Sequence, residues 1–330
     1  MNRSMTTLVA GLALGIAGSA FAGGGGVITG AGEATVAVES QGEVRHNTIE
    51  IDGLNIFYRE AGPKDAPVIL LLHGFPSSSH QYRDLIPLLS DKYRVIAPDY
   101  PGFGASDAPG LSEFEYTFDR YSEIVTSLTD RLKIESYTIY LFDYGAPVGF
   151  RVASARPDKV DGLIVQNGNA YDEGLREFWD PIKTFWADPN PVNTDALRGL
   201  LTIDATKWQY THGVKDLESV APEAWIVDQA YMDRHGNSEI QLALFYDYRT
   251  NVPLYPQWQS YFREYQPPML IVWGEGDFIF PSEGATPYLR DLPDAELHLL
   301  DTGHFVLEEY AEEAAALIRS FMERQVASGD

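Results

Sequence analysis

The stretch Tyr137-Thr138-Ile139-Tyr140-Leu141-Phe142-Asp143-Tyr144-Gly145-Ala146 decides the fold of this chain. Its first six residues are apolar, aromatic or β-branched, and such a continuous run is typical of a β-strand buried on both faces. Asp143 interrupts the run where a strand of this length would end, and Gly145 follows two residues later. Residues 146–156 then have helical spacing. The stretch therefore predicts a strand, a tight turn that carries a carboxylate, and a helix in direct succession.

The same alternation of strand and helix extends along the chain in both directions. Further apolar runs that predict strands lie at 67–72, 93–98, 162–166, 269–273 and 295–300. Segments with helical spacing lie at 82–89, 118–132 and 308–325. Residues 49–51 and 55–59 alternate around Asp52-Gly53, which indicates an antiparallel hairpin. Strands that alternate with helices imply an α/β fold, with a mostly parallel central sheet and helices on both of its faces.

The regular alternation stops between residues 171 and 257. Trp179, Trp186, Trp208 and Trp225 fall in this segment, together with irregular helical spacing and prolines. We interpret 171–257 as a helical cap inserted over the ends of the sheet, and 44–170 and 258–330 as the two parts of the core domain. Residues 23–43 are rich in Gly, Ala and Val and predict a flexible leader.

The first 22 residues resemble a secretory signal. Arg3 gives a short positive region, residues 8–17 form an apolar stretch, and Ala20-Phe21-Ala22 is a small-x-small cleavage site. We therefore expect cleavage near Ala22 and export to the periplasm or the medium, with an uncleaved N-terminal anchor as the alternative. No later stretch has the roughly 18 apolar residues that a membrane span needs.

The composition excludes several kinds of function. The chain has 330 residues, with 24 Lys+Arg against 48 Asp+Glu and a net charge of −24, which disfavours binding to nucleic acid. It has no Cys, so disulfides, thiolate metal sites and a cysteine nucleophile are excluded. Its seven His residues show no metal-binding spacing, and no Gly-rich loop fits a phosphate or dinucleotide. We expect no metal and no cofactor, and no pattern indicates an oligomeric state.

Residues that can carry chemistry stand directly after the predicted strands. In a parallel sheet, ligands bind beyond the carboxyl ends of the strands. The residues found at these positions are His73-Gly74-Phe75, Asp143, Gly274-Glu275-Gly276-Asp277 and Asp301-Thr302-Gly303-His304. Among the acids near His304, we favour Asp277 over Glu275 and Asp301, because a Gly-x-Gly-Asp turn just past a strand projects its side chain inward.

From about residue 44 to 325, the chain resembles the α/β-hydrolase superfamily. His73-Gly74 is similar to the oxyanion loop of that family, Asp143 stands at the position of the nucleophile, and His304 follows the last strand. Within the superfamily, the pattern Asp143-Tyr144-Gly145 resembles epoxide hydrolases and haloalkane dehalogenases. Two residues depart from the usual pattern, since Leu141 replaces a frequent Gly and Tyr144 stands where these branches usually place Trp.

An aspartate nucleophile restricts the reaction more than the fold does. Attack of a carboxylate on an ester would give an anhydride, whereas attack on an sp³ carbon gives an alkyl ester that water can hydrolyse. We predict that His304, oriented by Asp277, activates this water. The backbone N–H groups of Phe75 and Tyr144 would stabilise the oxyanion that forms on Asp143. The alternative for Asp143 is a structural role as the cap of the following helix.

The leaving group separates the two chemistries. Opening an epoxide produces an alkoxide, which needs a proton donor such as a cap tyrosine, whereas a halide needs only N–H or O–H donors. Phe245-Tyr246-Asp247-Tyr248-Arg249 resembles the segment in which epoxide hydrolases carry their ring-opening tyrosine, which maps onto Tyr248. The segment also resembles haloacetate dehalogenases. Those enzymes bind the substrate carboxylate with Arg residues at positions occupied here by Tyr144 and Pro147, so a haloacid substrate is disfavoured.

These patterns predict an epoxide hydrolase that releases a vicinal diol. A haloalkane dehalogenase that releases halide is the second hypothesis, and a non-catalytic ligand-binding protein on the same scaffold is the third. Tyr248 has a simpler alternative as a packed aromatic residue of the cap. The Trp-rich cap, with Trp186 expected at the substrate site, suits a small apolar or amphipathic organic substrate that reacts with water.

Overall fold

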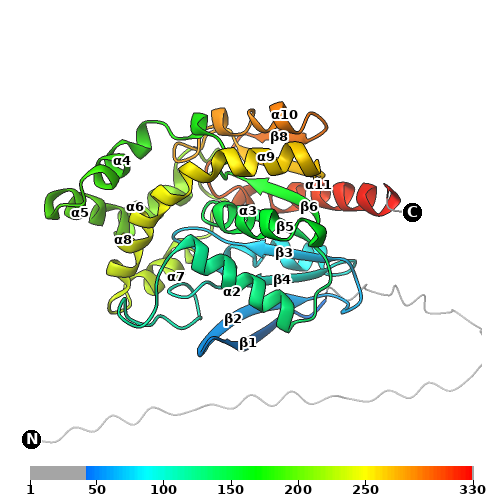
Figure 1. The fold of residues 1–330 in the computed structure, drawn as a ribbon, viewed down its shortest axis with the longest axis horizontal. Coiled ribbons are helices and arrows are strands. Elements are labelled where there is room, and N and C mark those ends of the chain that lie inside the picture. The colour runs from blue at the N-terminus through cyan, green and yellow to red at the C-terminus, as the bar shows by residue number, and fades with distance from the viewer. Residues whose placement is uncertain (1–41, 329–330) are drawn as a thin grey trace, which may run out of the picture. The chain divides into compact units, whose positions relative to one another are not determined.

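The computed structural model of the chain describes residues 42–328 (Figure 1). The predicted signal peptide, 1–22, and the predicted leader up to residue 41 lie outside the described residues. Among the helices of the described part, none combines the length and the apolar character needed to cross a membrane.

The described residues form an eight-stranded sheet in the order β1-β2-β4-β3-β5-β6-β7-β8. Its strands are β1 (Arg45–Ile51), β2 (Leu54–Ala61), β3 (Val68–Leu72), β4 (Arg94–Pro98), β5 (Tyr137–Phe142), β6 (Val160–Gln166), β7 (Met269–Gly274) and β8 (Glu296–Leu300). β1 and β2 pair with each other antiparallel, β2 also pairs antiparallel with β4, and every other pairing is parallel. The predicted hairpin and the mostly parallel sheet are thus confirmed.

Helices cover both faces of the sheet, and β5 shows why. Its side chains point alternately to opposite faces. Ile139 and Leu141 belong to one apolar cluster, and Tyr140 and Phe142 belong to a second cluster on the other face. The first cluster includes side chains of α2 (Phe118–Arg131), α3 (Gly145–Ala155) and α9 (Tyr255–Tyr265); the second includes side chains of α1 (Leu85–Leu89) and α11 (Leu307–Ser328). A strand buried from both sides explains the continuous apolar run in the sequence.

The segment between β6 and β7 is helical. It contains α4 (Asp180–Ala187), α5 (Pro191–Leu197), α6 (Ile203–Thr211), α7 (Glu223–Met232) and α8 (Asn237–Asp247), before α9 leads back to the sheet. Short 3-10 helices include η1 (Ser79–Tyr82), η5 (Arg198–Leu201) and η6 (Tyr248–Thr250), and α10 (Tyr288–Asp291) lies between β7 and β8. In Figure 1, α4 to α8 lie to one side of the sheet, whereas α9 runs alongside α3. We refer to the predicted range, 171–257, as the cap; its last three residues form the start of α9.

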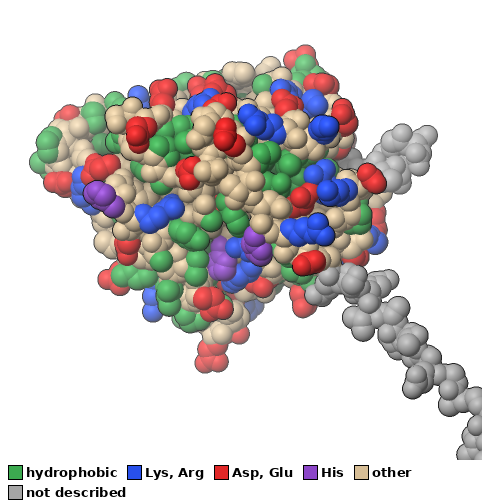
Figure 2. All heavy atoms as spheres, turned by 90° about the horizontal axis from the view of Figure 1, so that it is seen from below, with side chains coloured by type: hydrophobic (Ala, Val, Ile, Leu, Met, Phe, Trp, Pro, Cys, Tyr) green, Lys and Arg blue, Asp and Glu red, His purple; other side chains and the backbone are tan. Residues whose placement is uncertain are grey.

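Charged side chains are dispersed over the surface. On the face drawn in Figure 2, Asp and Glu lie among Lys and Arg and do not gather into one acidic patch. Many are paired, as in the contacts of Lys92 with Glu323 at 2.7 Å and of Arg156 with Asp130 at 2.6 Å. Exposed pairs of this kind contribute little to stability, so the excess of acids is mainly a solvated surface.

Candidate active site

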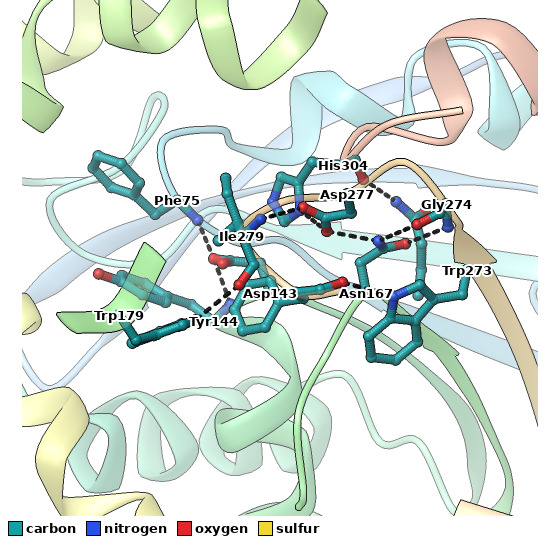
Figure 3. Close-up of polar contacts among 12 residues, drawn as sticks. Phe75, Asp143, Tyr144, Asn167, Trp179, Trp273, Gly274, Asp277, Ile279 and His304 are labelled. Carbon is teal, nitrogen blue, oxygen red and sulfur yellow. Dashed lines mark hydrogen bonds and ion pairs between the residues drawn. The ribbon is translucent and has the colours of Figure 1, made fainter. Parts of the chain in front are cut away.

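Four loops meet at the carboxyl ends of the parallel strands. The loop after β3 carries Phe75, the turn after β5 carries Asp143, the loop after β7 carries Asp277 and the loop after β8 carries His304. Figure 3 shows these residues grouped together. The strands stand in the order β3-β5-β6-β7-β8, so residues far apart in the sequence become neighbours at this edge of the sheet.

Asp143 occupies a tight turn between β5 and α3. Its φ angle is +49°, in the left-handed region that L-residues other than Gly, Asn and Asp rarely adopt. Two glycines make this turn feasible. A Cβ atom on Gly145 would lie 2.1 Å from the carbonyl oxygen of Leu72, and one on Gly74 would lie 2.2 Å from the Asp143 carboxylate. Glycine at these two positions therefore allows Asp143 to lie in contact with the loop that follows β3.

Two backbone groups bind one oxygen of the Asp143 carboxylate. The N–H groups of Phe75 and Tyr144 both donate to Oδ1, each at 2.6 Å, while Oδ2 accepts no hydrogen bond from the described residues. Burial raises the pKa of Asp143 to about 6, although His304 and the two N–H groups act in the opposite direction. The geometry leaves Oδ2 available for attack and places two donors on Oδ1.

His304 and Asp277 form a buried pair. Nδ1 of His304 lies 2.7 Å from Oδ2 of Asp277, and both side chains are almost fully buried. Burial by itself lowers the pKa of His304, but the charge and hydrogen bond of Asp277, together with the charge of Asp143, raise it above its ordinary value. Nε2 of His304 is buried without a hydrogen-bond partner. It is therefore free to accept a proton from a bound water.

Two further groups orient Asp277. Its Oδ1 accepts from the N–H of Ile279 at 2.7 Å, and its Oδ2 accepts from Nδ2 of Asn167, also at 2.7 Å. Asn167 is itself held by the N–H of Gly274, which donates to its Oδ1 at 3.0 Å. The sequence analysis missed Asn167, although it directly follows β6 and could have been found by the same strand-end criterion.

The other acids near His304 in the sequence do not reach it. Glu275 is exposed, and the exposed Asp301 pairs with Lys215 at 2.7 Å. Only the turn that ends in Asp277 directs a carboxylate toward the imidazole of His304 (Figure 3).

His73 shapes the oxyanion loop from behind. Its Nε2 accepts from the N–H of Tyr100 at 3.1 Å, and its Nδ1 lies 3.0 Å from the carbonyl oxygen of Gly74. Its ring is fully buried against the Tyr100 ring, with centroids 4.3 Å apart. Burial lowers the pKa of His73 to about 4, so the ring is neutral at pH 7. One nitrogen thus contacts the loop itself and the other binds Tyr100 after β4, and it is Phe75 that presents the N–H group to Asp143.

A largely apolar cavity lies over Asp143. Its volume is only about 30 Å³, so the cavity is narrow. Its lining residues are Phe75, Asp143, Tyr144, Phe178, Trp179, Ile182, Leu200, Gln209, Phe245, Tyr248 and Ile279. No Lys or Arg is among them. The cavity therefore suits a small, uncharged and mainly apolar molecule.

The predicted cap residues Tyr248 and Trp186 have different positions. Tyr248 lines the cavity, and its buried hydroxyl interacts with the buried hydroxyl of Tyr255. Trp186 stacks on Tyr248, with ring centroids 6.0 Å apart, but it does not line the cavity. Its indole N–H donates to the carbonyl oxygen of Phe245 at 2.7 Å. The cavity is lined instead by Trp179, whose N–H donates to the carbonyl oxygen of Ile279 at 2.8 Å.

The structure contains no obvious metal centre in its described part. Within residues 42–328, no group of three or more His, Asp or Glu side chains is arranged to hold a metal ion. Asp143, His304 and Asp277 lie in the arrangement that a nucleophile, a base and an orienting acid require.

The chain is similar in sequence to known hydrolases. An uncharacterised hydrolase of Saccharomyces cerevisiae is 44% identical over 271 residues, which cover 81% of this chain and 93% of the yeast protein. A haloalkane dehalogenase of Mycolicibacterium paratuberculosis is 41% identical over 116 residues, covering 35% of this chain and 38% of the dehalogenase.

A solved structure shows the same fold at lower sequence identity. The crystal structure of an epoxide hydrolase from Vigna radiata matches with a TM-score of 0.69 and 23% identity, and the match covers 86% of this chain and 98% of that one. The model of the alpha/beta hydrolase fold family matches residues 67–311, a range that contains Asp143, Asp277 and His304. The chain therefore belongs to the α/β-hydrolase family and is a hydrolase, and it is similar to a haloalkane dehalogenase over about a third of its length.

Proposed function

We propose that the protein is an epoxide hydrolase that converts a small epoxide to a vicinal diol. The observation that carries the proposal is the Tyr248 hydroxyl, which is buried, interacts with the hydroxyl of Tyr255, and belongs to a residue that lines the same cavity as Asp143. Burial raises the pKa of Tyr248 well above its ordinary value, so the hydroxyl keeps its proton until a strong base forms beside it. The alkoxide of an opening epoxide is such a base.

The first step is a displacement at carbon. Oδ2 of Asp143 forms a bond to an epoxide carbon, the carbon–oxygen bond of the ring breaks, and the ring oxygen takes the proton of Tyr248. Solvent then reprotonates the tyrosine. The two N–H groups at Oδ1 hold the carboxylate in a fixed orientation during attack. The product of this step is a hydroxyalkyl ester of Asp143.

The second step hydrolyses this ester. Nε2 of His304 removes a proton from water, and the oxygen of that water attacks the carbonyl carbon of the Asp143 ester. Negative charge then develops on Oδ1, where Phe75 and Tyr144 donate their N–H groups. The diol leaves with the oxygen that was Oδ2 and takes a proton from His304. The Asp143 carboxyl, which keeps the second proton of the water, then releases it to solvent and so balances the proton that Tyr248 took up. Esterification removes the charge of Asp143, which had raised the pKa of His304, and so favours the neutral base needed here.

Haloalkane dehalogenation is the second candidate, because a dehalogenase is 41% identical to this chain over 116 residues. Halide release needs N–H or O–H donors that face the leaving atom. The indole N–H of Trp179 is already donated to Ile279, and that of Trp186 to Phe245. The buried hydroxyl of Tyr248, which keeps its proton until a strong base forms beside it, is better suited to protonating an alkoxide, and we favour the epoxide.

Trapping the ester intermediate tests the proposal. In the His304→Gln variant, the ester of Asp143 should form but hydrolyse slowly, so intact-mass measurement after exposure to substrate should reveal an adduct. An epoxide adds its whole mass, whereas an alkyl bromide adds only its alkyl group. An adduct with bromides but not with epoxides would favour the dehalogenase. If neither class leaves an adduct on Asp143, the protein is not an alkyl-transferring hydrolase, and a binding role gains support.

A further inference from the structure

Gln209, a residue of α6 in the cap, has an unused amide at the substrate cavity. We propose that this amide anchors the substrate, so that the preferred epoxides carry one neutral oxygen, as an ether, hydroxyl or carbonyl, on an otherwise apolar body. This inference rests on the proposed function and deepens it by naming a substrate class. It makes Gln209 a specificity-determining residue, separate from the groups that perform the reaction.

The amide of Gln209 is the first observation behind this proposal. The residue is only 5% exposed and lines the cavity, yet its side chain makes no hydrogen bond with the described part of the chain. The neighbouring helix shows the usual situation for a buried amide. Gln229 accepts from the hydroxyl of Thr206 at 2.7 Å and donates to the carbonyl oxygen of Leu201 at 3.1 Å. Because buried polar groups are nearly always paired, the free amide of Gln209 calls for a partner.

The chemistry of the cavity limits what that partner can be. Apart from Gln209, the polar lining residues are Asp143, Tyr144 and Tyr248, and the remaining lining side chains are aromatic or aliphatic. Asp143 and Tyr248 act on the epoxide itself. An amide offers two N–H donors and one carbonyl acceptor, and no Lys or Arg is present to balance a charged group. The partner is therefore a neutral oxygen elsewhere on the substrate.

The position of the amide is fixed relative to the reacting groups. Next to Gln209, Tyr210 stacks on Phe305 with ring centroids 3.7 Å apart and planes within 7°. Two residues beyond α6, a Cβ atom on Gly213 would lie 2.2 Å from the carbonyl oxygen of Gly276, so the backbones touch. The cap helix thus packs on the residues that adjoin His304 and Asp277. A donor held in place before binding loses little freedom when the substrate arrives.

A matched set of epoxides isolates the role of the amide. The hydrocarbon 1,2-epoxyhexane has nearly the same shape as ethyl glycidyl ether, in which an oxygen replaces one CH₂ group, and 5,6-epoxyhexan-1-ol adds a terminal hydroxyl. For each compound, kcat/KM is measured with the wild-type protein and with Gln209→Leu, which keeps most of the volume and removes the amide. The preference is the ratio of kcat/KM for an oxygenated epoxide to kcat/KM for the hydrocarbon. Because the intrinsic reactivity of each compound is the same in both experiments, it cancels when this ratio is compared between the two proteins.

The expected result is a change in preference. The wild type should favour at least one oxygenated epoxide over the hydrocarbon by about 10-fold, because the hydrocarbon leaves a buried amide unpaired. In Gln209→Leu this preference should fall to roughly 1, mainly through KM. If the preference stays as in the wild type, the proposal is wrong. An equal loss of kcat with all three compounds would also overturn it, since it would indicate that Gln209 positions the hydrolytic water.

Two controls separate this role from a general effect on packing. Ile182→Leu changes the cavity lining without removing a polar group, and it should alter the rates with all three epoxides by similar factors. Gln209→Met provides a second apolar replacement if Gln209→Leu does not fold. Thermal unfolding of each variant verifies that the fold is retained.

A binding experiment separates this inference from the proposed function. Asp143→Asn lacks the nucleophile, so calorimetric titration with the same compounds reports binding alone. The preference for the oxygenated compounds should appear with Asp143→Asn and disappear with the double variant that also carries Gln209→Leu. Absence of epoxide turnover in the wild type would overturn the proposed function, whereas equal binding preferences in the two variants would overturn the role of Gln209.

Discussion

Asn167 donates a hydrogen bond of 2.7 Å to the same Oδ2 atom of Asp277 that lies 2.7 Å from Nδ1 of His304. The amide therefore fixes the orientation of the carboxylate, and the carboxylate fixes that of the imidazole. Asn167 has a φ angle of +44°, and it connects the end of β6 to the loop after β7 through the N–H of Gly274. It is a positioning residue that acts on the reaction through Asp277.

Replacing Asn167 with Gly should slow ester hydrolysis. Gly adopts the same positive φ without strain, so the variant removes the hydrogen bond to Asp277 and leaves the turn intact. A hydrogen bond to a charged group contributes about 1.5–3 kcal/mol, which corresponds to a roughly 10- to 100-fold slower second step. Rapid-quench kinetics should show an unchanged rate of ester formation and a lower steady-state kcat. Equal rates of hydrolysis in the variant and the wild type would contradict the role of Asn167.

The ring-opening step should lose activity in acid. Attack requires the ionised form of Asp143, whose pKa is raised to about 6 by burial. As the pH falls through this value the carboxyl gains a proton, and kcat/KM should drop about tenfold per pH unit below it. Measuring kcat/KM between about pH 4.5 and 8 checks this, with far-UV circular dichroism as a control for unfolding. A profile that stays flat to pH 4.5 would show that Asp143 ionises at its ordinary pKa.

Tyr248→Phe should distinguish the two candidate chemistries. The variant removes the proton donor and keeps the ring that stacks on Trp186. General acid catalysis typically contributes about 100- to 10,000-fold, so turnover of epoxides should fall by a factor in this range. Any turnover of alkyl bromides should change far less, because bromide needs no proton.

Tyr246→Phe is the matched control for this experiment. Tyr246 lies two residues before Tyr248, and its ring packs against Phe185 and under the guanidinium of Arg249, outside the cavity. Removing its hydroxyl should leave epoxide turnover within about twofold of the wild type. Similar losses in both variants would mean that the cap requires tyrosines for packing, and that Tyr248 is not the acid.

The buried carboxyl of Asp228 should make the free energy of unfolding depend on pH. This carboxyl is 1% exposed in α7 and accepts a hydrogen bond from the hydroxyl of Tyr210, while its Oδ1 has no partner. Burial raises its pKa well above the ordinary value. The folded state therefore binds a proton more tightly than the unfolded state, and the contribution of Asp228 to stability is lost as pH rises.

Asp228→Asn should accordingly stabilise the protein at pH 8 more than at pH 5. The neutral amide keeps an oxygen for Tyr210 and avoids a buried charge, so we expect a gain of about 1–3 kcal/mol at pH 8. Urea unfolding at both pH values measures the difference. The exposed Asp233, at the end of the same helix, provides the control Asp233→Asn, which should show no such dependence on pH. An equal effect of Asp228→Asn at the two pH values would contradict the assignment.

The cap was harder to predict than the core, and Trp179 and Trp186 illustrate the reason. Both belong to the same aromatic stretch, but only Trp179 lines the cavity. Which of the two lines the cavity depends on the orientation of α4 about its own axis where it packs on α8. The cap helices also bury polar residues, such as Gln209 in α6 and Gln241 in α8, so no simple apolar face marks their orientation in the sequence.

Asn167 was missed for a different reason. Asn residues are common in the loops that follow strands, so the residue type alone does not indicate a role. The contact of Asn167 with Asp277 arises because β6 and β7 are neighbours in the sheet. His73 shows the converse. The sequence correctly placed it in the loop beside Asp143, but the direction of its ring, toward Tyr100 and away from the reacting groups, depends on packing behind the loop.

The sheet and the ends of its strands could be predicted from the sequence alone. Strands buried on both faces must be continuously apolar, so the end of each run marks the edge of the sheet, and the short segments that follow these runs contain Asp143, Asp277 and His304. Only the tertiary structure decided which oxygen of Asp143 is held and which is free, and which cap side chains face it. These features depend on contacts between segments that are far apart in the chain, and such contacts leave no periodic pattern in the sequence.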